Sequence, residues 1–176
     1  MRCLWLALLL FVGAAQAALE ETDWLDLMPE SDRQALLDMP DISHDTPEAE
    51  SGFYTPSAGG LRTTDKNLPA VMYSAQTVAA LDGRKILLGG YPVPLETNAQ
   101  GRFVEFFLVP YPGACIHVPP PPPNQIVLVR YAKGVDLADI YQPLWIEGTL
   151  RVEGSSNELA DSAYTIMAEQ VELMSD

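Results

Sequence analysis

Basic residues, histidine and cysteine are scarce in this chain. Its 176 residues include ten Lys or Arg against 24 Asp or Glu, two histidines and two cysteines, and the formal charge is −14 at pH 7. Such a surface repels phosphate backbones and anionic lipid, so we expect no nucleic-acid partner. The charge is compatible with attracting metal cations or a basic partner, and equally with an ordinary acidic, solvated surface.

Long apolar runs are also missing, except for one at the start of the chain. Arg2 is followed by an apolar run from Cys3 to about Ala15, then by the small-x-small triplet that ends at Ala17. This layout predicts a signal peptide over residues 1–17, cleaved after about Ala17. At about 1.5 Å per residue, roughly 13 apolar residues do not span about 30 Å of hydrocarbon. We therefore expect an exported, periplasmic protein with no transmembrane segment in the mature chain.

Only Cys115 would survive this processing, because Cys3 belongs to the predicted signal peptide. One cysteine excludes an intramolecular disulfide, although thiols in an oxidising compartment are usually paired. Three interpretations stay open: a buried and inert thiol, a metal ligand, or an intermolecular disulfide.

Residues 18–69 are predicted to form a short helical arm followed by an acidic linker. Pro29 and Pro40 bound two short helical pieces, and Ser31 is predicted to cap a helix that begins near Asp32. From Pro40 onward the composition shifts to Asp, Glu, Ser, Thr, Gly and Pro, which is typical of a loop that runs over the surface.

Residues 70–176 are dominated by predicted strands. Apolar or alternating segments indicate strands over residues 85–88, 103–109, 126–129 and 143–153. The first of these is predicted to end at the Gly89-Gly90 pair. The continuous apolar run at 126–129 predicts a strand buried on both faces, whereas 143–153 alternates and predicts one apolar face.

The last segment, from Tyr164 onward, fits either the apolar face of a helix or a strand that changes parity at a bulge near Ala168. Counted as a strand, it completes the five needed for a small closed barrel of the oligonucleotide/oligosaccharide-binding (OB) type. We therefore expect a mainly β fold, a small five-stranded OB-like barrel with a short helical N-terminal arm. A sandwich or an α+β layer is the alternative.

The Cys-x-His segment ahead of the prolines is the candidate metal site. If Cys115 and His117 lie on an extended backbone, they are about 6.6 Å apart and point to the same side. A thiolate and an imidazole can then bind one zinc or copper ion at about 2.3 and 2.1 Å. His44, the other histidine, is the candidate third ligand. Carboxylate candidates for the remaining ligand of the metal are Glu105, Asp45 and Glu96.

In the structural alternative, no metal is bound: Cys115 packs in the core and His117 hydrogen-bonds a loop carbonyl.

Catalysis by the same pair is not expected. A catalytic base must reach the sulfur within about 3 Å and be oriented by a third group. Two side chains that lie two residues apart on one strand, as Cys115 and His117 do, are rarely that close. No Asn or Asp is placed to orient His117. We therefore expect a protein that is not an enzyme.

The five consecutive prolines at residues 119–123 favour the polyproline II form and would span roughly 15 Å. Since they lie between two predicted strands, we interpret them as a rigid spacer, or as a brace that holds the Cys-x-His strand against the barrel. The alternative is a docking rod for an aromatic-lined groove.

Parts of the chain resemble the bacterial family known as domain of unknown function 3299. The stretches that carry the resemblance are residues 90–96, residues 106–125 with their proline block, and residues 145–150. The resemblance covers roughly residues 70–173, with a weaker echo near Trp24 and His44. It implies no established activity, but it does imply exported proteins or lipoproteins associated with transporter-like permeases and the response to zinc shortage. This chain departs from lipid-anchored members because it has no cysteine at the mature start.

Two functions are open at this point. The first is a periplasmic accessory protein that binds or helps to handle a transition metal such as zinc through Cys115, His117 and His44, in association with an envelope protein or an ABC-type transporter. The second is a metal-free interaction module that docks on an envelope membrane complex. Metal bound at one equivalent would mark the first. A crosslinked partner that survives Cys115→Ser would mark the second.

Overall fold

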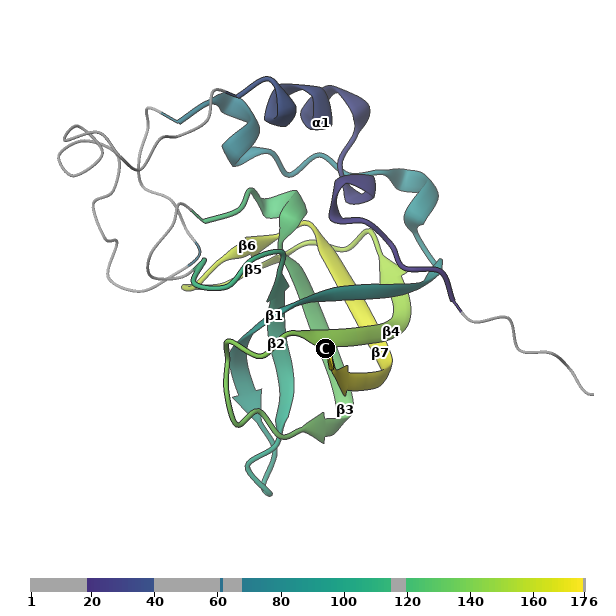
Figure 1. The fold of residues 1–176 in the computed structure, drawn as a ribbon, viewed down its shortest axis with the longest axis vertical. Helices are drawn as coiled ribbons and strands as arrows, with labels where there is room; N and C mark the ends of the chain where they lie inside the picture. Colours follow the sequence, from purple (N-terminus) through teal and green to yellow (C-terminus); the bar gives the residue numbers. More distant parts are fainter. Residues whose placement is uncertain (1–18, 40–60, 62–67, 115–119, 176) are drawn as a thin grey trace, which may run out of the picture.

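Within residues 19–39, 61, 68–114 and 120–175, which the computed structural model describes, five strands close into a barrel in the order β1-β2-β3-β7-β4 (Figure 1). These strands are β1 (Lys85–Thr97), β2 (Phe103–Val109), β3 (Val127–Val135), β4 (Leu144–Arg151) and β7 (Tyr164–Leu173). A small two-stranded sheet joins β4 to β7 and consists of β5 (Ser155–Ser156) and β6 (Asp161–Ser162). The expected mainly β, five-stranded OB-like barrel is confirmed.

The barrel closes because β1 is shared between two neighbours. Residues 85–90 of β1 pair with β4, and the half that begins at Tyr91 pairs with β2. β3 and β7 run parallel, whereas the other barrel pairs are antiparallel. Pro92 and Pro94 lie in the second half of β1, beyond its pairing with β4, so the missing amide protons cost no hydrogen bond to that strand.

The strand β1 is longer than predicted, because it continues through Gly89 and Gly90 instead of ending there. A Cβ atom at Gly89 would lie 2.7 Å from the ring of Trp145, and one at Gly90 would lie 2.8 Å from the side chain of Leu108. Glycine is therefore required where β1 changes partners, and the predicted strand end is wrong. The Gly-Gly pair permits a close approach of neighbouring side chains to the strand.

A bulge in β7 reconciles the two patterns found in the last segment. Gly148 of β4 pairs with Ala168, while the preceding Glu147 pairs with Gln170, so that Glu169 is an extra residue. This confirms the strand with a bulge near Ala168 and excludes the helical alternative.

Alternate residues of all five strands fill the barrel interior. The buried strand residues of this interior cluster are Ile86, Leu88, Phe106, Leu108, Val127, Val129, Leu144, Ile146, Leu150, Tyr164 and Ile166. Leu27 joins them from the N-terminal arm and is fully buried. The arm is therefore part of the barrel core, not an appendage to it.

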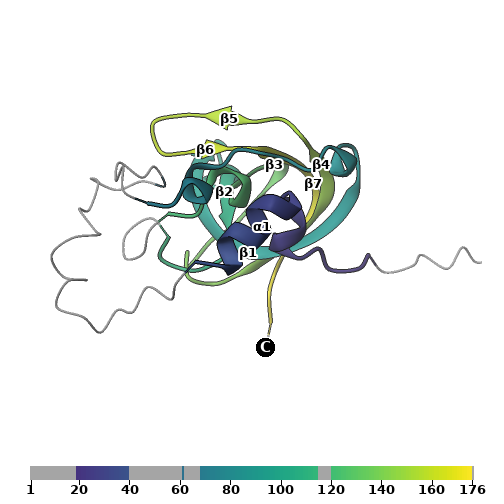
Figure 2. The ribbon, with the colours of Figure 1, turned by 90° about the horizontal axis from the view of Figure 1, so that it is seen from above.

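The arm closes one end of the barrel. It contains η1 (Trp24–Leu27) and α1 (Glu30–Leu37), and α1 lies over the barrel when the molecule is seen from above (Figure 2). The Tyr164 hydroxyl donates a hydrogen bond to the Leu27 carbonyl and accepts one from the Val78 amide, both at 2.7 Å. Burial raises the pKa of Tyr164 above its ordinary value.

The helix α1 begins two residues earlier than predicted. Its first residue is Glu30 and Pro29 stands at the N-cap, so the prediction that Ser31 caps a helix beginning near Asp32 is wrong. Ser31 lies inside the first turn, where its hydroxyl is 3.5 Å from the Asp32 carboxylate. Proline suits the entry to a helix because its fixed φ matches and its missing amide has no partner there.

The remaining short helices are η2 (Ala70–Tyr73), η3 (Ala79–Leu81) and η4 (Pro123–Gln125). In the described ranges, no helix is both long enough and apolar enough to cross a membrane. Most of the predicted acidic linker, residues 40–60 and 62–67, lies outside the described residues.

Candidate functional site

A second apolar cluster lies on the outside of the barrel, over β1, β2 and β3. Along β2, Phe106 and Leu108 point into the barrel while Phe107 and Val109 point outward, and all four are buried. Leu128 extends the outer cluster onto β3. Strands 2 and 3 form the face on which OB folds bind their ligands, so this cluster occupies the usual binding surface of the fold.

This outer face is covered by the chain itself. Leu61, a residue of the predicted linker, is 3% exposed, and its amide donates to the Leu159 carbonyl at 2.8 Å. Ala114 and Ala160 belong to the same cluster and are buried. The covering explains the uninterrupted apolar run at residues 126–129, and it confirms the prediction of a strand buried on both faces.

The cover leaves a hollow of about 80 Å³ at one edge of this face. Its walls come from the start of the second half of β1, the end of β2, the turn after β2 and the loop between β3 and β4. The lining residues are Tyr91, Pro92, Val93, Val109, Gly113, Ala114, Ile140 and Tyr141. None of them is charged, and Figure 1 shows the loop after β3 passing beside β1.

Ile140 and Tyr141 are the exposed part of this lining. Their exposed fractions are 45% and 49%, in a protein whose other apolar residues on this face are buried or half-buried. A single exposed apolar residue is normal on a protein surface, but two adjacent ones beside an apolar hollow form a continuous patch. Sequence reasoning missed them because they lie in a loop with no strand or helix period. The available signal was the large apolar pair itself, between Asp139 and Gln142.

The predicted metal ligands lie outside the described residues. Cys115 and His117 fall in the segment 115–119, and His44 falls in the segment 40–60. Across the part of the chain that the structure does describe, no group of three or more His, Cys, Asp or Glu side chains could hold a metal ion. Of the carboxylate candidates, Glu105 pairs with Arg130 at 3.1 Å.

The residues on either side of the Cys-x-His segment are anchored to the barrel. Ala114 is 1% exposed, and Pro121 and Pro122 are buried. At the end of the proline block, the chain turns into η4, and the Pro123 carbonyl accepts from the Ala163 amide at 2.9 Å. Buried prolines fit the brace interpretation and do not fit a docking rod that offers its surface to another protein.

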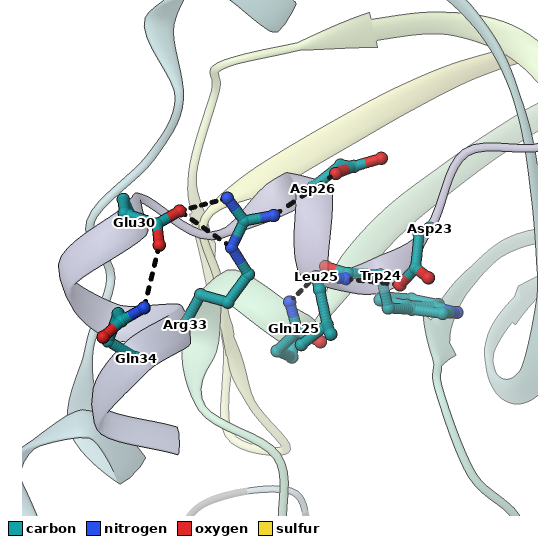
Figure 3. Close-up of polar contacts among 8 residues, drawn as sticks. All are labelled: Asp23, Trp24, Leu25, Asp26, Glu30, Arg33, Gln34 and Gln125. Atoms are coloured by element: carbon teal, nitrogen blue, oxygen red, sulfur yellow. Dashed lines mark hydrogen bonds and ion pairs between the residues drawn. The ribbon is translucent and has the colours of Figure 1, made fainter. Parts of the chain in front are cut away.

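Two polar residues that follow the prolines hold the arm in place. The Asn124 amide donates to the buried carboxylate of Asp32 at 3.0 Å, which also accepts from the Ser74 hydroxyl. Gln125 donates to the Trp24 carbonyl at 2.7 Å (Figure 3). The side chains of these contacts are directed at the arm, so this cluster serves to close the barrel.

The outer surface of the arm carries solvent-exposed ion pairs (Figure 3). Arg33 contacts the carboxylates of Glu30 and Asp26, and its guanidinium holds the pKa of Glu30 below the ordinary value. Exposed pairs of this kind contribute little to stability. A hollow of about 450 Å³ does lie at the start of the arm, where Glu21, Thr22, Asp23 and Trp24 line it, but it is wide open and carries two carboxylates. The hollow beside Ile140 and Tyr141, whose lining is uncharged, is the stronger candidate for a functional site.

Comparisons with known proteins agree with the resemblance seen in the sequence. The family described as "Protein of unknown function (DUF3299)" matches residues 24–173, so the match includes the arm as well as the barrel. A crystal structure of a DUF3299 family protein from Pseudomonas aeruginosa PAO1 is 40% identical, with a TM-score of 0.65. The alignment covers 90% of this chain and 98% of that one. No curated protein matches.

Proposed function

Since the chain belongs to the DUF3299 family, for which no function is known, we propose from its own geometry that it is a non-catalytic protein-binding module of the cell envelope. The module engages its partner at the hollow beside Ile140 and Tyr141. One observation carries this proposal: the apolar outer face of β1, β2 and β3 is largely buried, whereas Ile140 and Tyr141, which line its hollow, are 45% and 49% exposed.

The size of the hollow favours a protein partner over a small molecule. Pockets for cofactors and drug-sized ligands measure about 300 to 1,000 Å³, whereas this hollow measures about 80 Å³. Tyrosine and isoleucine beside a shallow hollow are typical of a protein interface, in which one anchoring side chain is surrounded by a contact rim. Export to the periplasm, predicted from residues 1–17, would place this partner in the envelope, where a transporter component is the expected candidate.

The test is recovery of a specific complex after crosslinking in cells. The chain is expressed with its own leader and crosslinked, and its complexes are compared for wild type, the double variant Ile140→Ser/Tyr141→Ser, and Cys115→Ser. We expect one defined complex that is lost in the double variant and unchanged in Cys115→Ser. A complex that persists in the double variant would refute the proposed surface.

We also propose a second function, zinc binding by Cys115 and His117 with His44 as a third ligand. The observation that favours it is that Ala114 and Pro121, which lie on either side of the Cys-x-His segment, are both buried. Zinc is a suitable ion for a thiolate and imidazole pair. The ordered neighbours would lower the entropy cost of bringing both ligands to one ion.

Metal content and zinc affinity of the reduced protein without a histidine tag test this second function. Zinc bound at one equivalent in wild type and lost in both Cys115→Ser and His117→Ala is the expected result. Binding weaker than about 10 µM, far below the strength of structural zinc sites, or binding unaffected by both changes would refute it.

A further inference from the structure

The hollow has room for one side chain of modest size. Its volume of about 80 Å³ lies well below the roughly 300 Å³ at which small-molecule pockets begin, which suits a single short side chain. The apolar lining favours a branched aliphatic group. The eight lining residues carry no charge, so a charged group placed inside would be desolvated without a partner.

The loop that carries the exposed pair is acidic. Between β3 and β4, Asp136 and Asp139 are the charged residues, and the loop contains no Lys or Arg. Asp136 follows Val135, which pairs with Phe103 at the start of β2, and it contacts Arg102, so it lies towards the other end of that strand from Val109 and the hollow. Asp139 accepts from the Tyr141 amide at 2.8 Å and forms no ion pair with any described residue, so its charge lies next to the patch.

The overall negative charge of the protein disfavours acidic partners. At −14, a second copy of this chain would be repelled, and so would nucleic acid or an anionic lipid surface. Carboxylates at the rim of an apolar contact attract a partner with the opposite charge and fix its orientation. An apolar centre with the carboxylate of Asp139 at its edge therefore matches an apolar residue that has basic neighbours.

Building on the proposed function, we propose that the hollow receives one branched aliphatic side chain from a segment of a partner protein, and that Lys or Arg residues flank this side chain. The aliphatic group fills the space between Val93, Ala114 and Ile140. A flanking cation lies against Asp139, while the Tyr141 ring covers the inserted side chain.

Fluorescence polarisation with labelled peptides tests this proposal on the mature protein. The first probe has one leucine between two pairs of lysines, the second has serine in place of leucine, and the third has glutamates in place of the lysines. We expect the first probe to bind about tenfold more tightly than the second, because leucine burial is lost in the second. The first should also weaken strongly between about 0.01 M and 1 M salt, where the Debye length falls from about 30 Å to about 3 Å.

Matched variants separate this site from general attraction of cations to an acidic protein. Asp139→Asn removes the charge at the edge of the hollow, and the side-chain oxygen of the asparagine introduced there can still accept from the Tyr141 amide. Glu147→Gln removes one charge from β4, and Asp136→Asn removes one from the far end of the same loop. We expect Asp139→Asn to weaken the lysine–leucine probe about threefold and both control variants to leave it nearly unchanged. Ile140→Ser should weaken the probe about tenfold without changing the folded state.

Equal loss in Asp139→Asn and in its control variants, equal binding of the leucine and serine probes, or no effect of Ile140→Ser would overturn the proposal. Its failure is distinct from failure of the proposed function. If the cellular complex depends on Ile140 and Tyr141 but is unchanged by Asp139→Asn, the binding surface stands and the basic–aliphatic partner is refuted. If no complex depends on Ile140 and Tyr141, the function itself is refuted.

Discussion

The two outer faces of the barrel differ in chemistry and in what covers them. Over β1, β2 and β3, the outward side chains include Phe107 and Val109, which are buried under other parts of the chain. Over β4 and β7, Lys85 of the adjoining β1 bonds Glu147 at 3.0 Å and Glu169 at 2.9 Å, and all three side chains remain solvent-accessible. One barrel therefore has an apolar face that needs a cover and a charged face that needs none.

The difference between the two faces shows which part of the barrel surface is open to a partner. An apolar face on an OB-like barrel is a ready binding surface, and here most of it is occupied by Leu61, Ala114 and Ala160. What is left is the hollow beside Ile140 and Tyr141. On the charged face, Met167 is as exposed as Tyr141.

The largest predicted effect comes from breaking the covered face. Phe107→Ala removes a fully buried ring from the outer cluster and should lower the free energy of unfolding by about 3–5 kcal/mol. Urea unfolding monitored by circular dichroism measures this. The matched change Thr149→Ala on the outer side of β4 should stay within about 0.5 kcal/mol. Similar losses in both variants would contradict the comparison of the two faces.

A smaller effect is expected where the arm closes the barrel end, away from both outer faces. Tyr164→Phe leaves the Leu27 carbonyl and the Val78 amide without their hydrogen-bond partner, which should cost about 1–3 kcal/mol in urea unfolding. An unchanged midpoint would show that the arm is held without this hydroxyl.

The same tyrosine predicts a loss of stability in alkali. Because the folded protein raises the pKa of Tyr164 above 10.0, the phenol favours folding while it is protonated. This contribution is present below pH 10 and is lost as the pH rises above that value. Wild type should therefore lose stability above pH 10 more steeply than Tyr164→Phe. Parallel pH profiles of the two proteins would refute the linkage.

The smallest effect is expected on the charged face. Lys85→Met removes the bonds to Glu147 and Glu169, but exposed ion pairs are screened by water and salt. The thermal midpoint should be almost the same as that of wild type, and any difference should disappear at high salt. A large loss that persists at high salt would show that this face contributes to the fold as the covered face does.

Much of the barrel could be predicted from the sequence because its strands obey simple periodicities. Residues 143–153 alternate because one face of β4 is buried. Residues 126–129 are continuously apolar because both faces of the chain are buried where β3 begins. The position of the bulge followed from the parity change near Ala168. The end of β1 was misjudged because Gly89 and Gly90 are required by neighbours distant in sequence, such as Trp145.

The candidate site was much less accessible to sequence reasoning. The hollow forms only where the loop containing Ile140 and Tyr141 meets β1 and the turn at Ala114, and no local pattern encodes such a contact. Cys115, His117 and His44 stood out because their chemistry is rare in this chain. Their joint binding of zinc remains a proposal.

Site-specific photo-crosslinking at Tyr141 and at Met167 tests the central claim most directly. Both side chains are 49% exposed, but Tyr141 borders the hollow and Met167 lies on β7. With a photoreactive amino acid at either position in living cells, we predict a discrete crosslinked partner from position 141 and none from position 167. The same partner from both positions, or a partner from position 167 alone, would contradict the assignment of binding to the uncovered edge of the apolar face.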